Sequence, residues 1–191
     1  VSQSLEIRSW QFRIATMRFF VYLSAFALSW LTFHAHAQSD HLDMDVEVLG
    51  VYFTPPANAA VAIVKAIDAS EREVLVQAYG FTDNAIAQAL VRAHERGVKV
   101  RVLLDQKSQS SNRYVIGVLT DAQIDLRQDG KHAIAHNKVM VIDQTIVITG
   151  SFNFTNSAAS RNAENFLVLK SEDLAEQYRL QWKNHWAHGV E

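Results

Sequence analysis

The 191-residue sequence contains no cysteine, which excludes a disulfide-stabilised scaffold and thiolate metal ligands. It has only two prolines and seven glycines, too few for a collagen-like or low-complexity chain. Neither sign of charge dominates: 18 basic and 20 acidic residues give a net charge of −2, which offers no support for nucleic-acid binding through overall charge. With 49% hydrophobic residues and no internal repeat, the chain is expected to bury a real core in one globular domain.

One apolar run lies near the amino terminus, shortly after Met17. The run is short for a transmembrane helix and ends in an Ala-His-Ala pattern that is typical of a signal-peptide cleavage site. We interpret residues 17–37 as a secretory signal peptide cleaved after Ala37, with residues 1–16 as an upstream extension. An uncleaved membrane anchor is the alternative. The catalytic domain would then be residues 38–191, carrying 15 basic and 19 acidic residues, and the simplest localisation is the bacterial periplasm.

Short apolar runs alternate with amphipathic stretches along the rest of the chain. The expected strands are residues 45–53, 73–79, 98–104, 124–127, 139–142, 146–148 and 165–169. The expected helices are residues 58–68, 83–96 and 114–120 and a last helix after residue 171, with Asn58, Asp83 and Ser171 as N-caps. This alternation predicts a layered α/β/α sandwich with a mixed sheet, in which a late hairpin supplies the antiparallel part.

The densest group of reactive residues lies in that late hairpin. His136 and Lys138 are two apart, so they share one face of a strand, and Ser151 and Asn153 repeat this spacing on the next strand. The polar residues 143–145 suit a hairpin connection. If the loop were residues 144 and 145 alone, Lys138 would face Ser151 and His136 would face Asn153. A cation, an imidazole, a hydroxyl and an amide would then converge, a set suited to holding and attacking a phosphate.

The full pattern is HxK, four residues, Asp, six residues and GSxN, carried by His136, Lys138, Asp143, Gly150-Ser151 and Asn153. It resembles the signature of the phospholipase D superfamily, with every spacing kept. The RNAEN stretch that follows resembles small bacterial endonucleases that carry one such motif per chain. The resemblance covers roughly residues 45 to 187. It implies a phospholipase D-like fold and a phosphodiesterase that works through a phosphohistidine, without metal or other cofactor.

Each motif residue has an expected role. His136 is the expected nucleophile, since a neutral imidazole can attack phosphorus. Lys138 and Asn153 are expected to hold the non-bridging phosphate oxygens. Ser151 would donate a further hydrogen bond, although an ordinary turn serine is nearly as good an interpretation. Gly150 would let the backbone approach the phosphate closely.

Three further residues lie around this core. Asp143 is expected to steady the hairpin turn rather than to contact the phosphate. Glu164 is the candidate to orient His136 by fixing its tautomer, with a solvated glutamate at a strand edge as the alternative. Arg161 would add positive charge beside the substrate, or else is a solvated loop residue.

The remaining histidines give no metal prediction. His132 and His136 are four apart, a ligand spacing on a helix. However, the residues after His136 predict a strand, and no carboxylate or cysteine completes a site. We therefore expect no metal and assign no role to His185 or His188.

Protonation of the leaving oxygen requires an acid, and the chain carries only one motif. A homodimer with a shared active site solves this, because each subunit then supplies one imidazole. The leading hypothesis is a metal-independent endonuclease of low specificity on DNA or RNA. A phospholipase D-type hydrolase of phospholipid head groups is the first alternative, although the sequence displays no obvious apolar loops for lipid. A non-catalytic nucleic-acid-binding module is the second.

Overall fold

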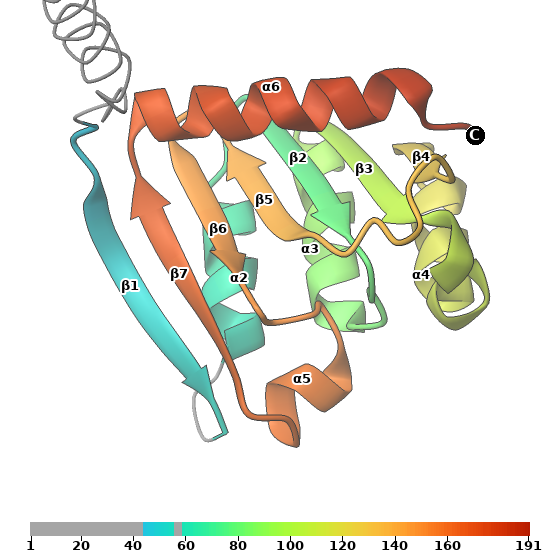
Figure 1. Ribbon diagram of the computed structural model, residues 1–191, viewed down its shortest axis with the longest axis horizontal. Helices are drawn as coiled ribbons and strands as arrows, with labels where there is room; N and C mark the ends of the chain where they lie inside the picture. The colour runs from blue at the N-terminus through green and yellow to red at the C-terminus, as the bar shows by residue number, and fades with distance from the viewer. Residues whose placement is uncertain (1–43, 56–58) are drawn as a thin grey trace, which may run out of the picture. The chain divides into compact units, whose positions relative to one another are not determined.

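The computed structural model describes residues 44–55 and 59–191, and a seven-stranded sheet lies at its centre (Figure 1). In chain order the strands are β1 (Glu47–Thr54), β2 (Glu73–Ala78), β3 (Lys99–Asp105), β4 (Asp125–Asp129), β5 (Lys138–Ile142), β6 (Ile146–Gly150) and β7 (Glu164–Lys170). Across the sheet the order is β1-β7-β6-β5-β2-β3-β4. The pairs β2–β3 and β3–β4 are parallel and the other pairs are antiparallel, so the sheet is mixed, as predicted.

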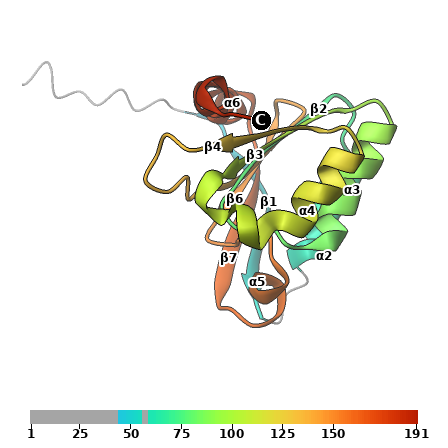
Figure 2. The ribbon, with the colours of Figure 1, turned by 90° about the vertical axis from the view of Figure 1, so that its right-hand side faces the viewer.

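Helices cover both faces of this sheet. In chain order they are α2 (Ala59–Asp68), α3 (Asn84–Glu95), the 3-10 turn η1 (Gln106–Ser108), α4 (Gln109–Asp121), α5 (Asn156–Ser160) and α6 (Glu172–His188). Figure 2 shows α2, α3 and α4 along one face and α6 on the other. The α/β/α sandwich expected from the alternating pattern is thus confirmed.

Two apolar cores, one on each face, explain the alternation along the strands. On β5, Met140 and Ile142 belong to the core beneath α2, α3 and α4, whereas Val139 and Val141 belong to the core beneath α6. Trp182 of α6 is 1% exposed, and its indole N–H donates a hydrogen bond of 2.9 Å to a β2 carbonyl oxygen. Burial and this hydrogen bond together anchor α6 across the sheet.

Several helix ends follow the local rules that predicted them. The carboxylate of Asp83 caps α3 by accepting from the N–H of Ile86 at 3.1 Å. The hydroxyl of Ser171 caps α6 by accepting from the N–H of Leu174 at 3.4 Å. Gly97 ends the α3 region with a φ of 90°, a conformation that favours glycine.

Two helices differ from the sequence expectation. Helix α4 begins at Gln109 rather than near Tyr114, because its buried face includes the polar residue Asn112, which an apolar pattern does not register. The short α5 was not expected. It is capped by the hydroxyl of Thr155, which accepts from the N–H of Ala158.

The amino-terminal interpretations lie outside the described residues. This applies to the signal peptide of residues 17–37, the extension before it and the Asn58 cap. Within residues 44–55 and 59–191, no helix is both long enough and apolar enough to cross a bilayer.

Candidate active site

The motif residues meet at one edge of the sheet. Strands β2 and β3 end there, β5 and β7 begin there and β6 ends there, which Figure 1 shows on the side opposite α6. In α/β proteins the carboxyl ends of parallel strands are the usual place for ligands. We call this set of His136, Lys138, Ser151, Asn153 and Glu164 the motif edge.

The hairpin that carries these residues has a different register from the one expected for a two-residue loop. The β5–β6 ladder pairs Val139 with Thr149 and Ile142 with Ile146, so the loop contains three residues, 143–145. Asp143 and Gln144 have φ angles of 51° and 62°, which turns the chain before the strand resumes. Lys138 and Ser151 are therefore not directly opposite each other, and that conditional expectation was wrong.

His136 and Lys138 differ sharply in their surroundings. His136 is exposed, whereas Lys138 is 7% exposed and starts β5. The ammonium of Lys138 donates a hydrogen bond of 2.6 Å to the carbonyl oxygen of His136. Tyr79 joins the two: its ring centroid lies 4.8 Å from that of His136 and 5.6 Å from the Lys138 nitrogen. A free imidazole thus stands beside a buried cation, as attack on an anionic ester requires.

The electrostatics of Lys138 reflect this burial. Desolvation lowers the pKa of Lys138, and the negative charge of Glu164 partly opposes that shift. A buried ammonium close to a single carboxylate is incompletely neutralised. Lys138 is therefore suited to binding a further anion, such as a phosphate oxygen.

Glu164 is held by partners other than the one expected. Its carboxylate accepts from the hydroxyl of Ser151 at 2.6 Å and from the amide of Asn162 at 3.1 Å. The Ser151 oxygen in turn accepts from the N–H of Asn165 at 3.1 Å. Among the described residues no hydrogen bond joins Glu164 to His136, so within one chain Glu164 orients Ser151 instead.

The remaining amide of the motif lies on the neighbouring loop. The side-chain oxygen of Asn153 accepts from the N–H of Gly80 at 3.4 Å, a long contact. A side chain at Gly80 would approach Asn153 and Thr155 at 3.3 and 3.2 Å, so a residue without a side chain suits this junction. The loop after β2 therefore helps to fix the position of Asn153.

Asp143 has the structural role expected for it. Its carboxylate accepts three backbone N–H groups, from Glu71 at 2.9 Å, Arg72 at 2.7 Å and Glu73 at 2.9 Å. The guanidinium of Arg72 also donates to the carbonyl oxygen of Asp143 at 2.6 Å. These bonds tie the hairpin loop to the start of β2, at the end of the strands opposite the motif edge.

Gly150 and Arg161 have explanations of their own. A Cβ at Gly150 would collide with the carbonyl oxygen of Asn165 and lie 2.6 Å from the Cα of Phe166, so close approach of β7, rather than of phosphate, is what requires glycine here. The exposed guanidinium of Arg161 donates to the hydroxyl of Ser157 at 2.6 Å, which holds it at the end of α5.

Comparisons with known proteins identify this arrangement. The family described as "Cardiolipin synthase, PLD-like domain" matches residues 63–186. The chain belongs to the phospholipase D superfamily. A Rickettsia conorii protein called phospholipase D is 46% identical over 135 residues, which cover 71% of this chain and 68% of that protein.

Solved structures agree with this membership. Nuc from Salmonella typhimurium, a phospholipase D family member, superposes with a TM-score of 0.73 and 34% identity, over 76% of this chain and 97% of Nuc. NucT from Helicobacter pylori, with a TM-score of 0.70 and 23% identity over 76% of this chain and 99% of NucT, shares the fold. Because superfamily members are phosphodiester hydrolases, the chain is an enzyme of that class.

Three residues that support this phospholipase D site were not found from the sequence. They are Tyr79, which contacts His136 and Lys138, and the buried Asn112 and Asp105. The side-chain amide of Asn112 holds the loop after β2 in two places. It donates to the carbonyl oxygen of Tyr79 at 2.8 Å and accepts from the N–H of Phe81 at 2.8 Å. The carboxylate of Asp105 accepts from the N–H of Ala135 at 2.9 Å, just before His136. Tyr79 and Asp105 have one sequence signal, their position at the carboxyl ends of β2 and β3, whereas Asn112 lies within α4.

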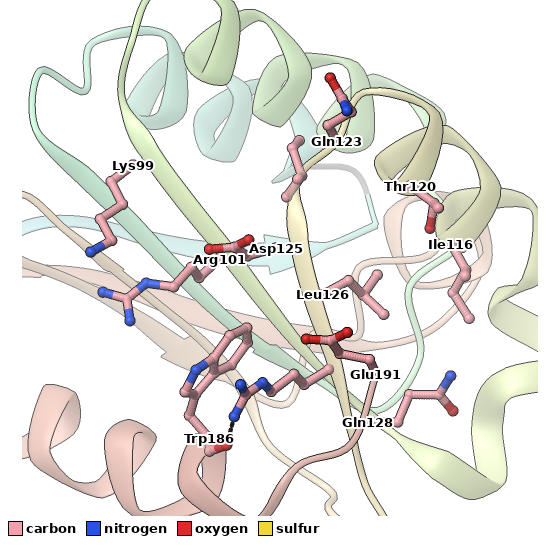
Figure 3. A pocket seen from close by; sticks show the side chains of 12 residues that line it. Lys99, Arg101, Ile116, Thr120, Gln123, Asp125, Leu126, Gln128, Trp186 and Glu191 are labelled. Carbon is pink, nitrogen blue, oxygen red and sulfur yellow. Dashed lines mark hydrogen bonds between the residues drawn. The ribbon is translucent and has the colours of Figure 1, made fainter.

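A hollow of about 610 Å³ lies elsewhere, along β4 (Figure 3), and none of its lining residues belongs to the superfamily motif. Two of its three cationic side chains, those of Arg101 and Arg127, are already engaged. Arg101 pairs with Glu73 at 2.8 Å, and Arg127 donates to the carbonyl oxygen of Trp186 at 3.0 Å, the dashed contact of Figure 3. This hollow marks the seam between β4 and α6, apart from the motif edge.

Proposed function

We propose that this chain is a metal-independent endonuclease of low specificity that cleaves DNA or RNA through a phosphohistidine at His136. The observation that carries the proposal is the exposed imidazole of His136 beside the buried ammonium of Lys138. Lys138 and Asn153 would hold the non-bridging oxygens, and Ser151, positioned by Glu164, would add a hydrogen bond.

The reaction would proceed in two displacements. A ring nitrogen of His136 bonds to phosphorus while the bond from phosphorus to the leaving oxygen breaks, and an imidazolium protonates that oxygen. Water then attacks the phosphohistidine, transferring its proton to the second imidazole, and His136 is released. Each step needs two imidazoles: His136 is first the nucleophile and then the leaving group, and the second is first the acid and then the base.

The second imidazole is proposed to be His136 of the partner subunit in a homodimer. Of the other histidines in residues 44–55 and 59–191, three surround Asp129, and His94 lies in α3. None of these contacts the ring of His136, whose aromatic neighbour is Tyr79. A two-fold axis beside the exposed motif edge would bring two copies of His136 into one site.

Local charge favours nucleic acid as substrate even though the overall charge does not. Lys107 and Arg161 are exposed, Lys107 in the 3-10 turn that follows β3 and Arg161 at the end of α5. Lys107 contacts the carbonyl oxygen of Ala133, three residues before His136, at 2.5 Å. Such a basic rim suits a long polyanion whose phosphates extend beyond the reacting group.

A phospholipid substrate is the second candidate, and one observation favours it. On the edge strand β1, Leu49, Val51 and Phe53 are exposed, Phe53 by 63%. Exposed apolar side chains can contact a lipid surface. The relative from Rickettsia conorii is also called phospholipase D.

The deciding experiment compares four substrates in a metal chelator: plasmid DNA, single-stranded DNA, RNA and phosphatidylcholine vesicles, each with the His136→Ala variant alongside. Cleavage of nucleic acid that the variant lacks supports the proposal. Turnover of lipid alone overturns the substrate assignment. A requirement for added divalent metal, shown by protein that stays folded in the chelator, overturns the mechanism. If folded wild-type protein binds nucleic acid without any turnover, the chain is a binding module instead.

The shared site has its own test. Co-expression of wild-type and His136→Ala chains gives mixed dimers. If one site needs both imidazoles, activity falls with the square of the wild-type fraction, to about a quarter at equal amounts. A fall to about a half would mean that each chain acts alone.

The proposed localisation is the periplasm, after cleavage behind Ala37. Amino-terminal sequencing of the protein recovered from a periplasmic fraction would begin at Gln38 if this is correct. Retention of the leader in the membrane fraction would support the anchor instead.

A further inference from the structure

A second cluster of polar side chains lies at the other end of the loop that leads to His136. Asp129 ends β4, His132 follows in the loop, and His185 and His188 occupy the end of α6. Asp129 is 0% exposed. We call Asp129, His132, His185 and His188 the histidine cluster.

The four side chains converge on one point. One carboxylate oxygen of Asp129 lies 2.9 Å from Nδ1 of His132 and 2.8 Å from Nδ1 of His185, and the other lies 3.3 Å from Nε2 of His188. One donor atom from each residue can be chosen so that all four lie within 4.8 Å of one another. Tetrahedral zinc with ligand bonds of about 2.0–2.2 Å spaces its donors at roughly 3.3 Å, so small side-chain rotations suffice.

Hydrogen bonds alone do not explain why three histidines gather around one aspartate. Three imidazoles crowd a single carboxylate, with ring centroids of 4.7, 5.4 and 5.5 Å between pairs. Nε2 of His188 is buried, and although it lies 3.3 Å from a carboxylate oxygen of Asp129, it forms no hydrogen bond of good geometry within the described part of the chain. A buried nitrogen without a well-formed hydrogen bond is costly, and a cation at the centre would remove that cost.

A backbone N–H also binds the carboxylate of Asp129. Lys131 donates this backbone bond at 3.0 Å.

Outer contacts also resemble those of a metal centre. The amide of Gln181 lies 3.0 Å from Nε2 of His185, and a half-turn of that amide would place its oxygen there as an acceptor. Next to the cluster, Gln128 and Val190 exchange two backbone hydrogen bonds of 2.7 and 3.0 Å, which fix the end of α6 against β4. His132, whose side chain is 44% exposed, leaves one open side through which an ion can enter.

We propose that Asp129, His132, His185 and His188 bind one Zn²⁺ in a closed tetrahedral site. Four protein ligands leave no open position for substrate, so the ion is structural rather than catalytic. It fastens the end of α6 to the loop that begins after β4 and ends at His136. The motif edge would therefore work without metal while its supporting loop is held by one.

The test uses the full chain as expressed, with zinc measured by elemental analysis and by titration after removal of metal. The expected result is one Zn²⁺ per chain, a Co²⁺ form with the absorption of a tetrahedral site, and a rise in Tm of about 5–10 °C at a hundredfold excess of zinc over Kd. Absence of bound zinc, together with an unchanged Tm on adding it, overturns the proposal.

Variants assign the ligands. His132→Ala changes the most exposed ligand and should leave the fold intact while weakening zinc binding more than about 100-fold, and His185→Ala should do the same. Gln181→Ala should weaken it roughly tenfold. His94→Ala, outside the cluster, is the matched control and should bind zinc like wild type. Equal binding by His132→Ala and His94→Ala would exclude the assigned site. His136→Ala should lose activity but keep its zinc, which separates a failure of this proposal from a failure of the proposed function.

Discussion

The motif edge and the histidine cluster stand at opposite ends of one loop, yet they use histidine in opposite ways. His136 at the motif edge is exposed, and Glu164, the carboxylate expected to orient it, is bonded to Ser151 and Asn162 instead. In the histidine cluster, three rings gather around Asp129, which solvent does not reach. At one end of the loop the imidazole is open to solvent, and at the other end three imidazoles contact one buried carboxylate.

This difference follows from what each task demands. A nucleophile must reach its substrate, so it needs access and a nearby charge that its own chain does not neutralise. A structural ion must be enclosed, so its ligands have to converge and exclude substrate. Counting histidines in the sequence cannot separate the two tasks, because the distinction lies in which side chains the fold brings together.

The largest expected effect comes from changing one histidine in each region and comparing the loss of activity with the loss of zinc. His136→Ala should lower phosphodiesterase activity by roughly 10³-fold or more, because the covalent step has no replacement, while zinc content stays unchanged. His132→Ala should lose zinc and keep most of its activity at a temperature where it remains folded. Paired measurements of turnover and metal content check both halves. If His132→Ala abolished turnover in a folded protein, the two regions would not be separable.

Lys138→Met should produce the next largest effect. Loss of the buried cation should lower activity by about 10²-fold, the scale seen when one group that stabilises a transition state is removed. Stability should change by no more than about 1 kcal/mol, because an apolar side chain of similar length avoids the desolvation of a buried ammonium. Activity assays and denaturant unfolding at neutral pH measure the two effects.

The pH dependence of stability, compared between wild type and Lys138→Met, tests the same explanation independently. Because burial lowers the pKa of Lys138 from 10.5, the unfolded chain binds more protons than the folded chain between the lowered value and 10.5. Wild-type stability should therefore rise relative to Lys138→Met as pH increases through that window. A falling difference would mean that Glu164 dominates and that the ammonium is stabilised by its surroundings.

The sequence predicted the fold and the motif residues because both depend on local order. Fixed spacing brought His136, Lys138, Ser151 and Asn153 to one edge, and alternating apolar residues predicted the strands. The histidine cluster was missed because its halves are more than fifty residues apart, and because the ligand spacing considered joined His132 to the wrong histidine. Tertiary packing of α6 against β4, not any local pattern, assembles it.

Asp143→Ala tests the prediction that part of the motif serves the fold alone. The change removes the acceptor of three backbone N–H groups at the start of β2, far from the motif edge. We expect a loss of about 1–2 kcal/mol in the free energy of unfolding, comparable to the loss of a helix cap, and activity per folded molecule within a few-fold of wild type. Denaturant unfolding and turnover at low temperature check this, with Gln144→Ala in the same loop as control. A large loss of turnover at unchanged stability would assign Asp143 a chemical role.

The smallest effect is expected at Tyr79, which the sequence did not single out. Its ring contacts both His136 and Lys138, but within the described residues its hydroxyl forms no hydrogen bond. Tyr79→Phe should therefore retain activity within about twofold, since the ring contact is worth more than the polar tip. Tyr79→Leu should lower activity roughly fivefold, because the flat ring that orients the imidazole is lost, while zinc binding at the histidine cluster is unaffected. Equal activity of the two variants would mean that the imidazole of His136 is oriented by the substrate or by the partner subunit rather than by Tyr79.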